Sequence, residues 1–302
     1  MGSGIKATIG AFTEIENSIM HRKKLSGLFR LFRFELPFAA GVCVILGELL
    51  ALGKVPTIWE MTLGFLSVFL ISATSLILND YFDLESDRIN APERPLPAGL
   101  VTKREVVFLS CAVTALGFLA GVLLSFQALL VVILTWAVGF LYNWRFKKTG
   151  LPGNLMVSFS VGMTFIFGGV AVGKPFEVAV WFFGMLALLI NLGEEIAADA
   201  MDMDGDRKAG SRSLPVLMGR ENAIRISATL FFLVIVISFL PFVLGWMEWI
   251  YALPFLFMDG MILVSTIKLL DAKLANRRRY IRWIYLSASL AILIVIVIRL
   301  LK

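Results

Sequence analysis

Histidine and cysteine are nearly missing from this sequence of 302 residues. It contains one histidine, His21, and two cysteines, Cys43 and Cys111. A single histidine argues against a histidine-based catalytic triad and against a zinc site held by several histidines. Both cysteines lie inside apolar runs without the spacing of metal ligands, so a disulfide framework is not expected either.

Charged residues are also scarce, at 17% of the chain, whereas hydrophobic residues make up 59%. The mean hydropathy is +0.86. This balance excludes an ordinary soluble domain and is typical of a helical membrane protein with several spans. The apolar runs extend from one end of the chain to the other, so we expect a single domain over residues 1–302.

Nine apolar runs are long enough to cross a bilayer as helices, which predicts an all-α polytopic membrane protein. The predicted spans cover residues 34–53, 57–79, 104–124, 127–144, 154–173, 176–198, 223–245, 249–270 and 281–300. Ahead of them, residues 1–30 mix isoleucine, phenylalanine and leucine with charged residues, which predicts an amphipathic helix on the membrane surface.

The distribution of lysine and arginine sets the expected topology. With these nine spans, 24 of the 28 basic residues fall on one side of the membrane, and the other side holds Lys54, Lys174, Arg299 and Lys302. Basic loops are retained in the cytoplasm, so we expect the N-terminus on the cytoplasmic side of a cell membrane. The same bias explains the pI of 9.4, and we expect no nucleic-acid partner.

Two acidic stretches follow predicted spans, one from Asn79 to Asp87 and the other from Glu194 to Asp206. Together they hold 10 of the 22 acidic residues. Both lie at the C-terminal end of a span, where the helix dipole disfavours a carboxylate by about 0.3–1 kcal/mol. Carboxylates crowded beside lipid repel one another and need a cation to stay ionised. These positions therefore favour a functional role over a solvated acidic surface.

Helical spacing places the acidic residues of each stretch on one face. Asp80, Asp83 and Asp87 are separated as i, i+3 and i+7, and the second stretch repeats the pattern at Glu195, Asp199, Asp202 and Asp206. Two such faces across a bundle would form a cup of oxygen ligands without histidine or cysteine. Such a set suits Mg²⁺, which bridges carboxylates to phosphates.

Basic residues share the predicted cytoplasmic side with the acidic stretches. Residues 88–99 form a loop stiffened by three prolines, and its Arg94 could bind a phosphate with two hydrogen bonds. Further basic residues follow the fourth span and the second acidic stretch, at Arg145, Lys147, Lys148, Arg207, Lys208 and Arg212. Each group alone is typical of a topology anchor. Beside a metal site, they favour a pocket that neutralises a diphosphate.

These motifs resemble those of the UbiA superfamily of intramembrane prenyltransferases. The first acidic stretch matches N-D-x-x-D-x-x-x-D, and the loop to Gly99 matches D-R-x-N-x-P-x-R-P-x-P-x-G. The second stretch matches D-x-x-x-D at Asp202 and Asp206. Within the superfamily, Asp199 and the segment 147–150 resemble archaeal digeranylgeranylglyceryl phosphate synthases. The resemblance covers nearly the whole chain.

The resemblance implies an enzyme that uses two Mg²⁺ ions to transfer a polyprenyl group, expected to be C20 geranylgeranyl, from its diphosphate to a lipophilic acceptor. It implies a central cavity among the nine helices, open to the cytoplasmic side. The implied metal ligands are Asp80, Asp83, Asp87, Asp199, Asp202 and Asp206. The implied diphosphate-binding residues are Asn79, Arg33, Arg88, Arg94, Lys147 and Lys208. The implied catalytic residues are Asp83, Asp199, Asp202 and Tyr142.

The acceptor expected from this resemblance is geranylgeranylglyceryl phosphate, in the synthesis of ether lipids. An aromatic acceptor in quinone biosynthesis is the alternative within the superfamily. Two other classes of protein also place carboxylates in membranes. A cation-coupled transporter would place them near the midplane on broken helices. A protein that only presents prenyl lipids would bind the donor without releasing diphosphate.

Overall fold

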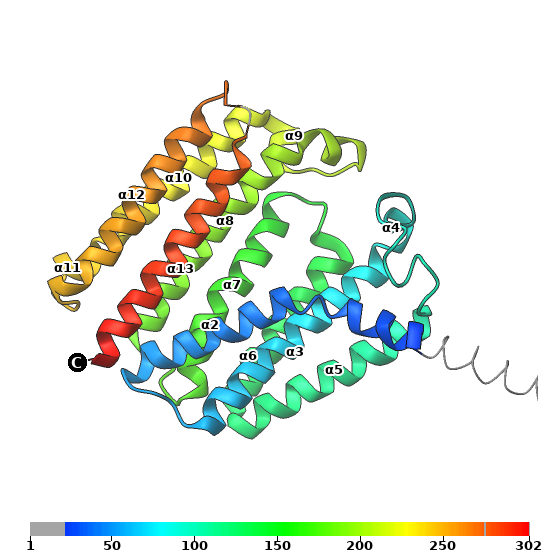
Figure 1. Ribbon diagram of the computed structural model, residues 1–302, viewed down its shortest axis with the longest axis horizontal. Coiled ribbons are helices and arrows are strands. Elements are labelled where there is room, and N and C mark those ends of the chain that lie inside the picture. The colour runs from blue at the N-terminus through cyan, green and yellow to red at the C-terminus, as the bar shows by residue number, and fades with distance from the viewer. Residues whose placement is uncertain (1–21, 275, 302) are drawn as a thin grey trace, which may run out of the picture.

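The computed structural model describes residues 22–274 and 276–301, and within them the chain is helical and contains no strand (Figure 1). Nine of the helical segments in this part of the chain are long and apolar enough to cross a membrane, which confirms the predicted all-α polytopic fold. Residues 22–31 form a helix ahead of the first span. The rest of the predicted surface helix, residues 1–21, lies outside the described residues.

The spans are long helices, most of them joined by short turns. Their bounds are α2 (Glu35–Leu52), α3 (Ile58–Phe82), α5 (Lys103–Leu124), α6 (Phe126–Leu141), α7 (Leu151–Ala171), α8 (Val178–Lys208), α10 (Arg220–Ser238), α12 (Ala252–Leu270) and α13 (Arg278–Leu301). Shorter segments are α4 (Leu84–Asn90), the π-helical turn η1 (Tyr142–Phe146), α9 (Leu214–Met218), α11 (Leu240–Val243) and η2 (Trp249–Tyr251).

Two helix starts follow directly from the local sequence. Thr57 and Thr102 each precede a span, and each forms a capping box with the glutamate three residues later. The hydroxyl oxygen of Thr57 accepts from the amide of Glu60 at 3.2 Å, and the Glu60 carboxylate accepts from the Thr57 amide at 2.8 Å. Each such cap stabilises a helix by about 1 kcal/mol, which fixes where α3 and α5 begin.

The end of α8 differs from the prediction. We expected this span to end near residue 198, whereas the helix continues to Lys208. No proline interrupts this segment, and the first residue with a left-handed backbone after it is Gly210, with a φ of 69°. The polar residues of the second acidic stretch therefore extend α8 beyond the apolar region, in agreement with their helical spacing.

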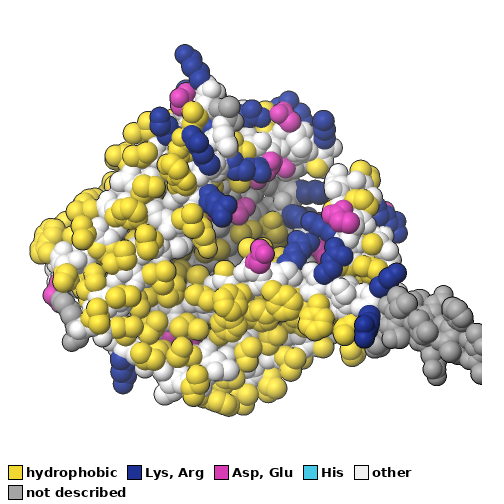
Figure 2. Space-filling view, in the orientation of Figure 1, with side chains coloured by type: hydrophobic (Ala, Val, Ile, Leu, Met, Phe, Trp, Pro, Cys, Tyr) yellow, Lys and Arg dark blue, Asp and Glu magenta, His cyan; other side chains and the backbone are white. Residues whose placement is uncertain are grey.

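The helices form two groups that meet at α7. In Figure 1, α8, α10, α12 and α13 lie together, α2, α3, α5 and α6 form the other group, and α7 runs between them. The first group packs around buried side chains such as Ile196, Phe231 and Ile262. In the second group, Ile77 and Val106 belong to a separate core between α3 and α5. Apolar side chains cover much of the outer surface, as expected for contact with lipid (Figure 2).

A close contact joins α2 to α7. A Cβ atom added to Gly168 would collide with the backbone of Val44, and one added to Gly47 would collide with the backbone of Phe165. Only glycine allows the two backbones to approach this far, which is how small residues mediate helix packing in membranes. The contact fixes α2 against the centre of the bundle.

Both acidic stretches lie at the same end of the bundle. In Figure 1, α3 ends next to α4, and α8 ends near α9, on the same side of the molecule. The turns that follow α6 and α12 reach this side as well, because the spans alternate in direction. We call it the polar end. Lysine, arginine, aspartate and glutamate side chains surround a hollow there (Figure 2).

Candidate active site

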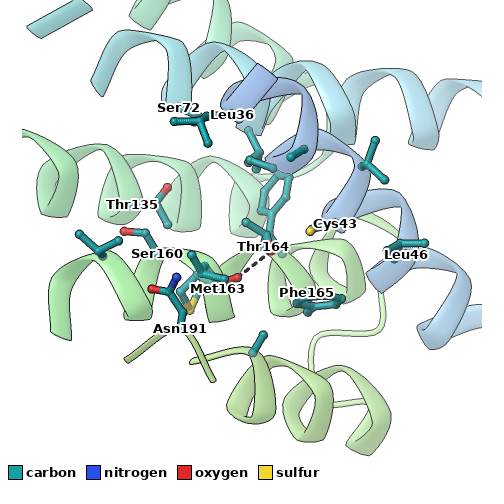
Figure 3. A pocket seen from close by; sticks show the side chains of 18 of the residues that line it. Leu36, Cys43, Leu46, Ser72, Thr135, Ser160, Met163, Thr164, Phe165 and Asn191 are labelled. Carbon is teal, nitrogen blue, oxygen red and sulfur yellow. Dashed lines mark hydrogen bonds between the residues drawn. The ribbon is translucent and has the colours of Figure 1, made fainter. Parts of the chain in front are cut away.

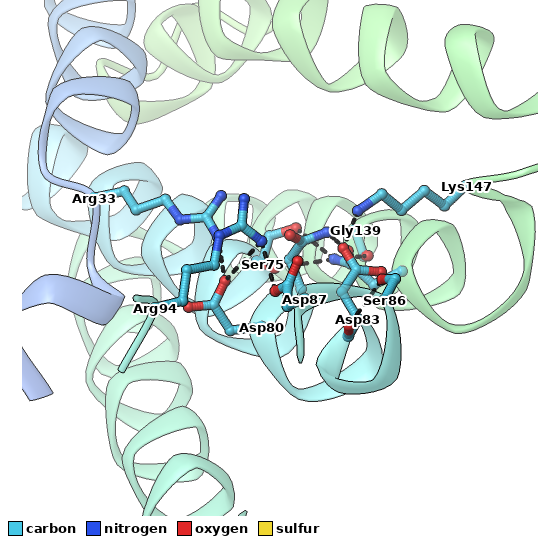
Figure 4. A network of polar contacts seen from close by, with 11 residues as sticks. Arg33, Ser75, Asp80, Asp83, Ser86, Asp87, Arg94, Gly139 and Lys147 are labelled. Carbon is cyan, nitrogen blue, oxygen red and sulfur yellow. Dashed lines mark hydrogen bonds and ion pairs between the residues drawn. The ribbon is translucent and has the colours of Figure 1, made fainter. Parts of the chain in front are cut away.

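The three aspartates of the first acidic stretch each bind a basic side chain (Figure 4). Arg33 donates to Asp80 and Lys147 donates to Asp83. Nη1 of Arg94 lies 2.6 Å from Oδ2 of Asp87. The side chain of Asp80 is 1% exposed and that of Asp87 is 8% exposed. Buried carboxylates must be paired to remain ionised, and these three are.

Arg94 lies between two of these carboxylates. Besides its bond to Asp87, its Nη1 lies 3.9 Å from Oδ1 of Asp80. Burial by itself would lower the pKa of Arg94. The hydrogen bond and charge of Asp87, with the charges of Asp80 and Asp83, outweigh burial and raise it. The guanidinium is therefore held charged, and the proline-rich loop carries it back over the end of α3.

Asn79 is held by a second amide, which the sequence analysis missed. Nδ2 of Asn79 donates to Oδ1 of Asn143 at 2.9 Å. Asn143 in turn donates to the carbonyl oxygens of Ser75 at 2.9 Å and Gly139 at 3.0 Å. Asn143 lies in η1 and is buried. An amide in an otherwise apolar run was the available signal, but the π-helical turn that aims it toward α3 has no clear sequence signature.

The second acidic stretch faces two different neighbours. Oδ2 of Asp199 accepts from Nδ2 of Asn154 on α7 at 2.8 Å. Asp202 accepts from Arg278 at the start of α13 at 2.5 Å, and both of these side chains are 61% exposed. Asp199 is close enough to Asp202 and Asp206 to interact with them electrostatically. Asp199 is therefore the inner member of this group, and Asp202 is the outer one.

Tyr142 is within electrostatic range of both acidic stretches. It is the first residue of η1, and it interacts electrostatically with Asp83 from the first stretch and with Glu195 and Asp199 from the second. At the polar end, one tyrosine is therefore close to residues from both predicted acidic faces. Asp80 and Asp87 continue the site on the α3 side through their pairs with Arg33 and Arg94.

Two of the predicted diphosphate-binding residues lie apart from this group. Nη1 of Arg88 lies 3.1 Å from Oε1 of Glu85 within α4, and both side chains are largely exposed. The i, i+3 spacing within α4 pairs them on an outer face. Lys208 is exposed at the end of α8 and forms no ion pair within the described part of the chain. Their predicted roles stay predictions.

The chemistry of the donor set fits Mg²⁺, because these ligands are carboxylate oxygens without nitrogen or sulfur. Across residues 22–274 and 276–301, however, no three histidine, cysteine, aspartate or glutamate side chains are arranged to hold a metal ion. Arginine and lysine side chains instead bind the carboxylates of Asp80, Asp83 and Asp87 (Figure 4). An anionic ligand that attracts these basic groups would free the carboxylates.

A cavity of about 750 Å³ lies beneath the polar end. Its walls come from α2, α3, α6, α7, α8, α12 and α13, and most of its lining is apolar (Figure 3). Ser75 and Gly139, which accept hydrogen bonds from Asn143, are part of the lining. The cavity thus begins directly under the Asn79–Asn143 pair, and its volume lies in the range of about 300–1,000 Å³ found for ligand pockets.

An apolar cavity beneath paired aspartates, arginines and a lysine defines a membrane-embedded site for a ligand with an anionic headgroup and a hydrocarbon chain. Residues 40–298 match the UbiA prenyltransferase family. The chain therefore belongs to this family, and it is a prenyltransferase.

Individual relatives resemble this chain over most of its length. A digeranylgeranylglyceryl phosphate synthase of Thermococcus gammatolerans is 38% identical over 205 residues, which are 67% of this chain and 72% of that protein. A solved structure concerned with digeranylgeranylglyceryl phosphate synthase in membranes matches with a TM-score of 0.82 and 28% identity, over 92% of this chain and 99% of that chain. A UbiA homolog from Archaeoglobus fulgidus bound to GPP and Mg²⁺ matches with a TM-score of 0.65 and 20% identity. The match covers 88% of this chain and 96% of that chain.

Proposed function

We propose that this protein transfers a C20 geranylgeranyl group from its diphosphate to the free hydroxyl of geranylgeranylglyceryl phosphate, in a reaction that depends on Mg²⁺. The observation that carries the proposal is the position of the apolar cavity directly beneath the ion-paired polar end. The relatives named digeranylgeranylglyceryl phosphate synthase support the choice of acceptor. The homolog bound to GPP and Mg²⁺ supports the choice of donor class and metal.

In this proposal the donor diphosphate is bound by Arg33, Arg94 and Lys147. These are the three basic side chains already held at Asp80, Asp87 and Asp83. Asn79 above the cavity, with Arg88 and Lys208 on the exposed surface, completes the predicted binding set. A diphosphate competes with the aspartates for the same donors, since phosphate and carboxylate both bind guanidinium with paired hydrogen bonds. The ion pairs keep the basic groups in place before the substrate arrives.

Two Mg²⁺ ions would be held by Asp80, Asp83, Asp87, Asp199, Asp202 and Asp206. When bound, they neutralise the charge that builds on the departing diphosphate. For the second group, Asp202 must exchange Arg278 for metal, which its exposed position allows.

The remaining groups act on the hydrocarbon side of the bond that breaks. The cavity excludes water from the allylic cation that forms when the C–O bond is cleaved. Trp136 and Phe140 line it with ring centroids 5.6 Å apart, and with Tyr142 they offer aromatic faces to that cation. The hydroxyl of the acceptor then attacks the cation, and Asp199 is the proposed proton acceptor. In the proposed topology, which the basic-residue bias supports, this chemistry takes place on the cytoplasmic side.

An acceptor panel tests the proposal directly. Purified protein in liposomes is given labelled geranylgeranyl diphosphate and Mg²⁺ with geranylgeranylglyceryl phosphate, and separately with a hydroxybenzoate or a naphthoate. We expect prenylated product with the glyceryl phosphate acceptor, and none after chelation of the metal. Product with an aromatic acceptor alone would overturn the proposed acceptor. Donor binding without release of diphosphate would favour a lipid-presenting protein, and ion flux without product would favour a transporter.

A further inference from the structure

The apolar cavity contains one polar patch that no step above uses. Asn191 and Glu194 of α8 both line the cavity, and their i, i+3 spacing places them on the same face of the helix. Thr135 of α6 and Ser160 of α7 extend the patch. Figure 3 shows the polar ends of Thr135, Ser160 and Asn191 on one side of the cavity. The patch faces the space that a substrate would occupy.

The hydrogen bonds within this patch leave two groups without partners. The hydroxyl of Ser158 lies 3.1 Å from Oδ1 of Asn191, whereas Nδ2 of Asn191 donates to no residue in the described ranges. Oε1 of Glu194 is buried and has no hydrogen-bond partner among the described residues. Thr135 and Ser160 donate to backbone carbonyls of their own helices. The patch therefore offers one unused donor, Asn191, and one unused acceptor, Glu194.

A buried carboxyl without a partner is unfavourable, and such a group in a native protein calls for a ligand that satisfies it. The depth of Glu194 indicates where that ligand lies. Glu194 precedes Asp199 by five residues on α8, so it lies about 7.5 Å deeper along the helix axis. It is therefore placed below the charged groups of the polar end, at the upper part of the cavity.

We propose that Asn191 and Glu194 form the binding site for the hydroxyl group of the acceptor. A hydroxyl has one hydrogen to donate and lone pairs to accept, and the patch matches both. In the bound acceptor the hydroxyl donates to Glu194, and Nδ2 of Asn191 donates to the hydroxyl oxygen. The proton passes to Asp199, the proposed proton acceptor, only as the new ether bond forms. The pair thereby holds the oxygen that attacks the prenyl group. This inference rests on the proposed function, because it takes the acceptor to be an alcohol.

The same site disfavours aromatic acids as acceptors. A hydroxybenzoate or naphthoate bound in the cavity would bury its carboxylate beside Glu194, where no lining residue in the described part of the chain carries a positive charge, and an unpaired buried charge is unfavourable. A glyceryl phosphate acceptor carries its phosphate at one end of the molecule. This phosphate can stay among the basic residues of the polar end while the hydroxyl reaches the patch. Glu194 thus contributes to acceptor specificity as well as to binding.

The test compares substitutions that remove or keep the acceptor oxygen. Glu194→Met removes the accepting oxygen but keeps a side chain of similar size, and Glu194→Gln keeps one carbonyl oxygen. Glu48→Met is the matched control, because Glu48 is a fully buried glutamate of α2 that does not line the cavity. Each variant is assayed for kcat/KM with geranylgeranylglyceryl phosphate, and for binding of a non-reactive geranylgeranyl thiodiphosphate. Binding of an acceptor analogue that lacks the attacking hydroxyl is measured in parallel.

We expect Glu194→Met to lower kcat/KM for the acceptor by about 10- to 100-fold, because the hydroxyl of the bound acceptor is left without its hydrogen-bond partner. Affinity for the thiodiphosphate should stay at the wild-type value, and Glu194→Gln should recover part of the loss. Wild type should bind the hydroxyl-free analogue more weakly than the true acceptor, and this difference in affinity should be smaller in Glu194→Met.

Three results for Glu194→Met would each overturn the inference while leaving the proposed function intact. They are unchanged transfer, an equal loss of donor binding, and discrimination against the analogue that is as strong as in wild type. Wild-type protein that fails to prenylate geranylgeranylglyceryl phosphate would instead refute the proposed function, and the inference with it.

Discussion

Lys147 and Lys148 are neighbours with the same side chain and different surroundings. Lys147 is bound to Asp83 inside the site, whereas Lys148 is exposed and has no ion-pair partner within the described residues. The difference arises because the π-helical turn and the following bend aim Lys147 toward α3. If the site needed only positive charge at this end of the molecule, the two lysines would contribute equally to activity. If it needs a lysine at a specific position, only Lys147 contributes.

Replacing Lys147 by methionine should therefore reduce kcat by about 10²- to 10³-fold, the usual loss when one preorganised electrostatic group is removed from an active site. Lys148→Met should change kcat by less than about fivefold, as expected for an exposed charge. Steady-state turnover of labelled geranylgeranyl diphosphate measures both. Thermal unfolding of each variant serves as the control for folding. Equal losses in the two variants would contradict the specific role of Lys147.

Local spacing could place the aspartates on helix faces, and it could identify Arg94 in a rigid loop. It could not pair them. Arg33 and Asp80 are 47 residues apart in the chain, and Lys147 and Asp83 are 64 apart. Such contacts depend on how the spans pack, which helical periodicity does not determine. Arg88 illustrates the limit, because it is in the same motif as Arg94 and lies on the outer face of α4 with Glu85.

At the scale of single elements, α2 carries an unusual buried group. Glu48 is fully buried, and neither of its carboxylate oxygens has a hydrogen-bond partner in the described residues. Asp259 of α12 provides the contrast, because its Oδ2 accepts a hydrogen bond from Ser238 of α10 at 2.7 Å. Both are acidic residues within spans, where such residues are rare. Only Asp259 is bound to a neighbouring helix by its side chain.

Glu48→Met should consequently stabilise the protein by about 1–3 kcal/mol, because it replaces an unpaired buried polar group by an apolar one of similar size. Asp259→Leu should produce a smaller gain, since it removes the hydrogen bond that Ser238 donates from the neighbouring helix. Thermal unfolding in detergent compares the two variants with wild type. A loss of stability in Glu48→Met would mean that Glu48 binds a group essential to the fold.

Hydropathy was sufficient to predict the spans, because a bilayer requires long apolar helices whatever their packing. Irregular elements were not predictable in the same way. The π-helical turn at Tyr142–Phe146 determines where Asn143 and Lys147 point, yet its five residues are not distinctive in composition. Hydropathy alone placed the end of the sixth span near residue 198, whereas α8 continues to Lys208, as the helical spacing of its acidic residues indicated.

The molecule as a whole is polar at one end and apolar around its sides (Figure 2). The proposed topology places the polar end in the cytoplasm, where the basic residues of a membrane protein are retained. In this orientation the hydrocarbon chain of a substrate stays within the hydrophobic core of the bilayer, while its diphosphate reaches the aqueous side. The cavity and the polar end then match the two parts of one amphiphilic ligand.

Labelling of single cysteines in intact cells tests this orientation. In a background with Cys43 and Cys111 replaced by alanine, Lys54→Cys should react with a membrane-impermeant maleimide added outside. Lys148→Cys should react only after the membrane is permeabilised, because it lies at the polar end. Labelling in the opposite order would show that the polar end faces outward.

The central claim is that the two acidic stretches bind one diphosphate headgroup together, next to Tyr142. Diffraction from crystals grown with Mn²⁺ and geranylgeranyl thiodiphosphate measures this most directly, because manganese can be located by its anomalous scattering. The account predicts manganese at Asp83 and at Asp199 with the diphosphate between them, and the prenyl chain in the cavity below. Metal bound at only one stretch, or a diphosphate located away from Tyr142, would contradict it.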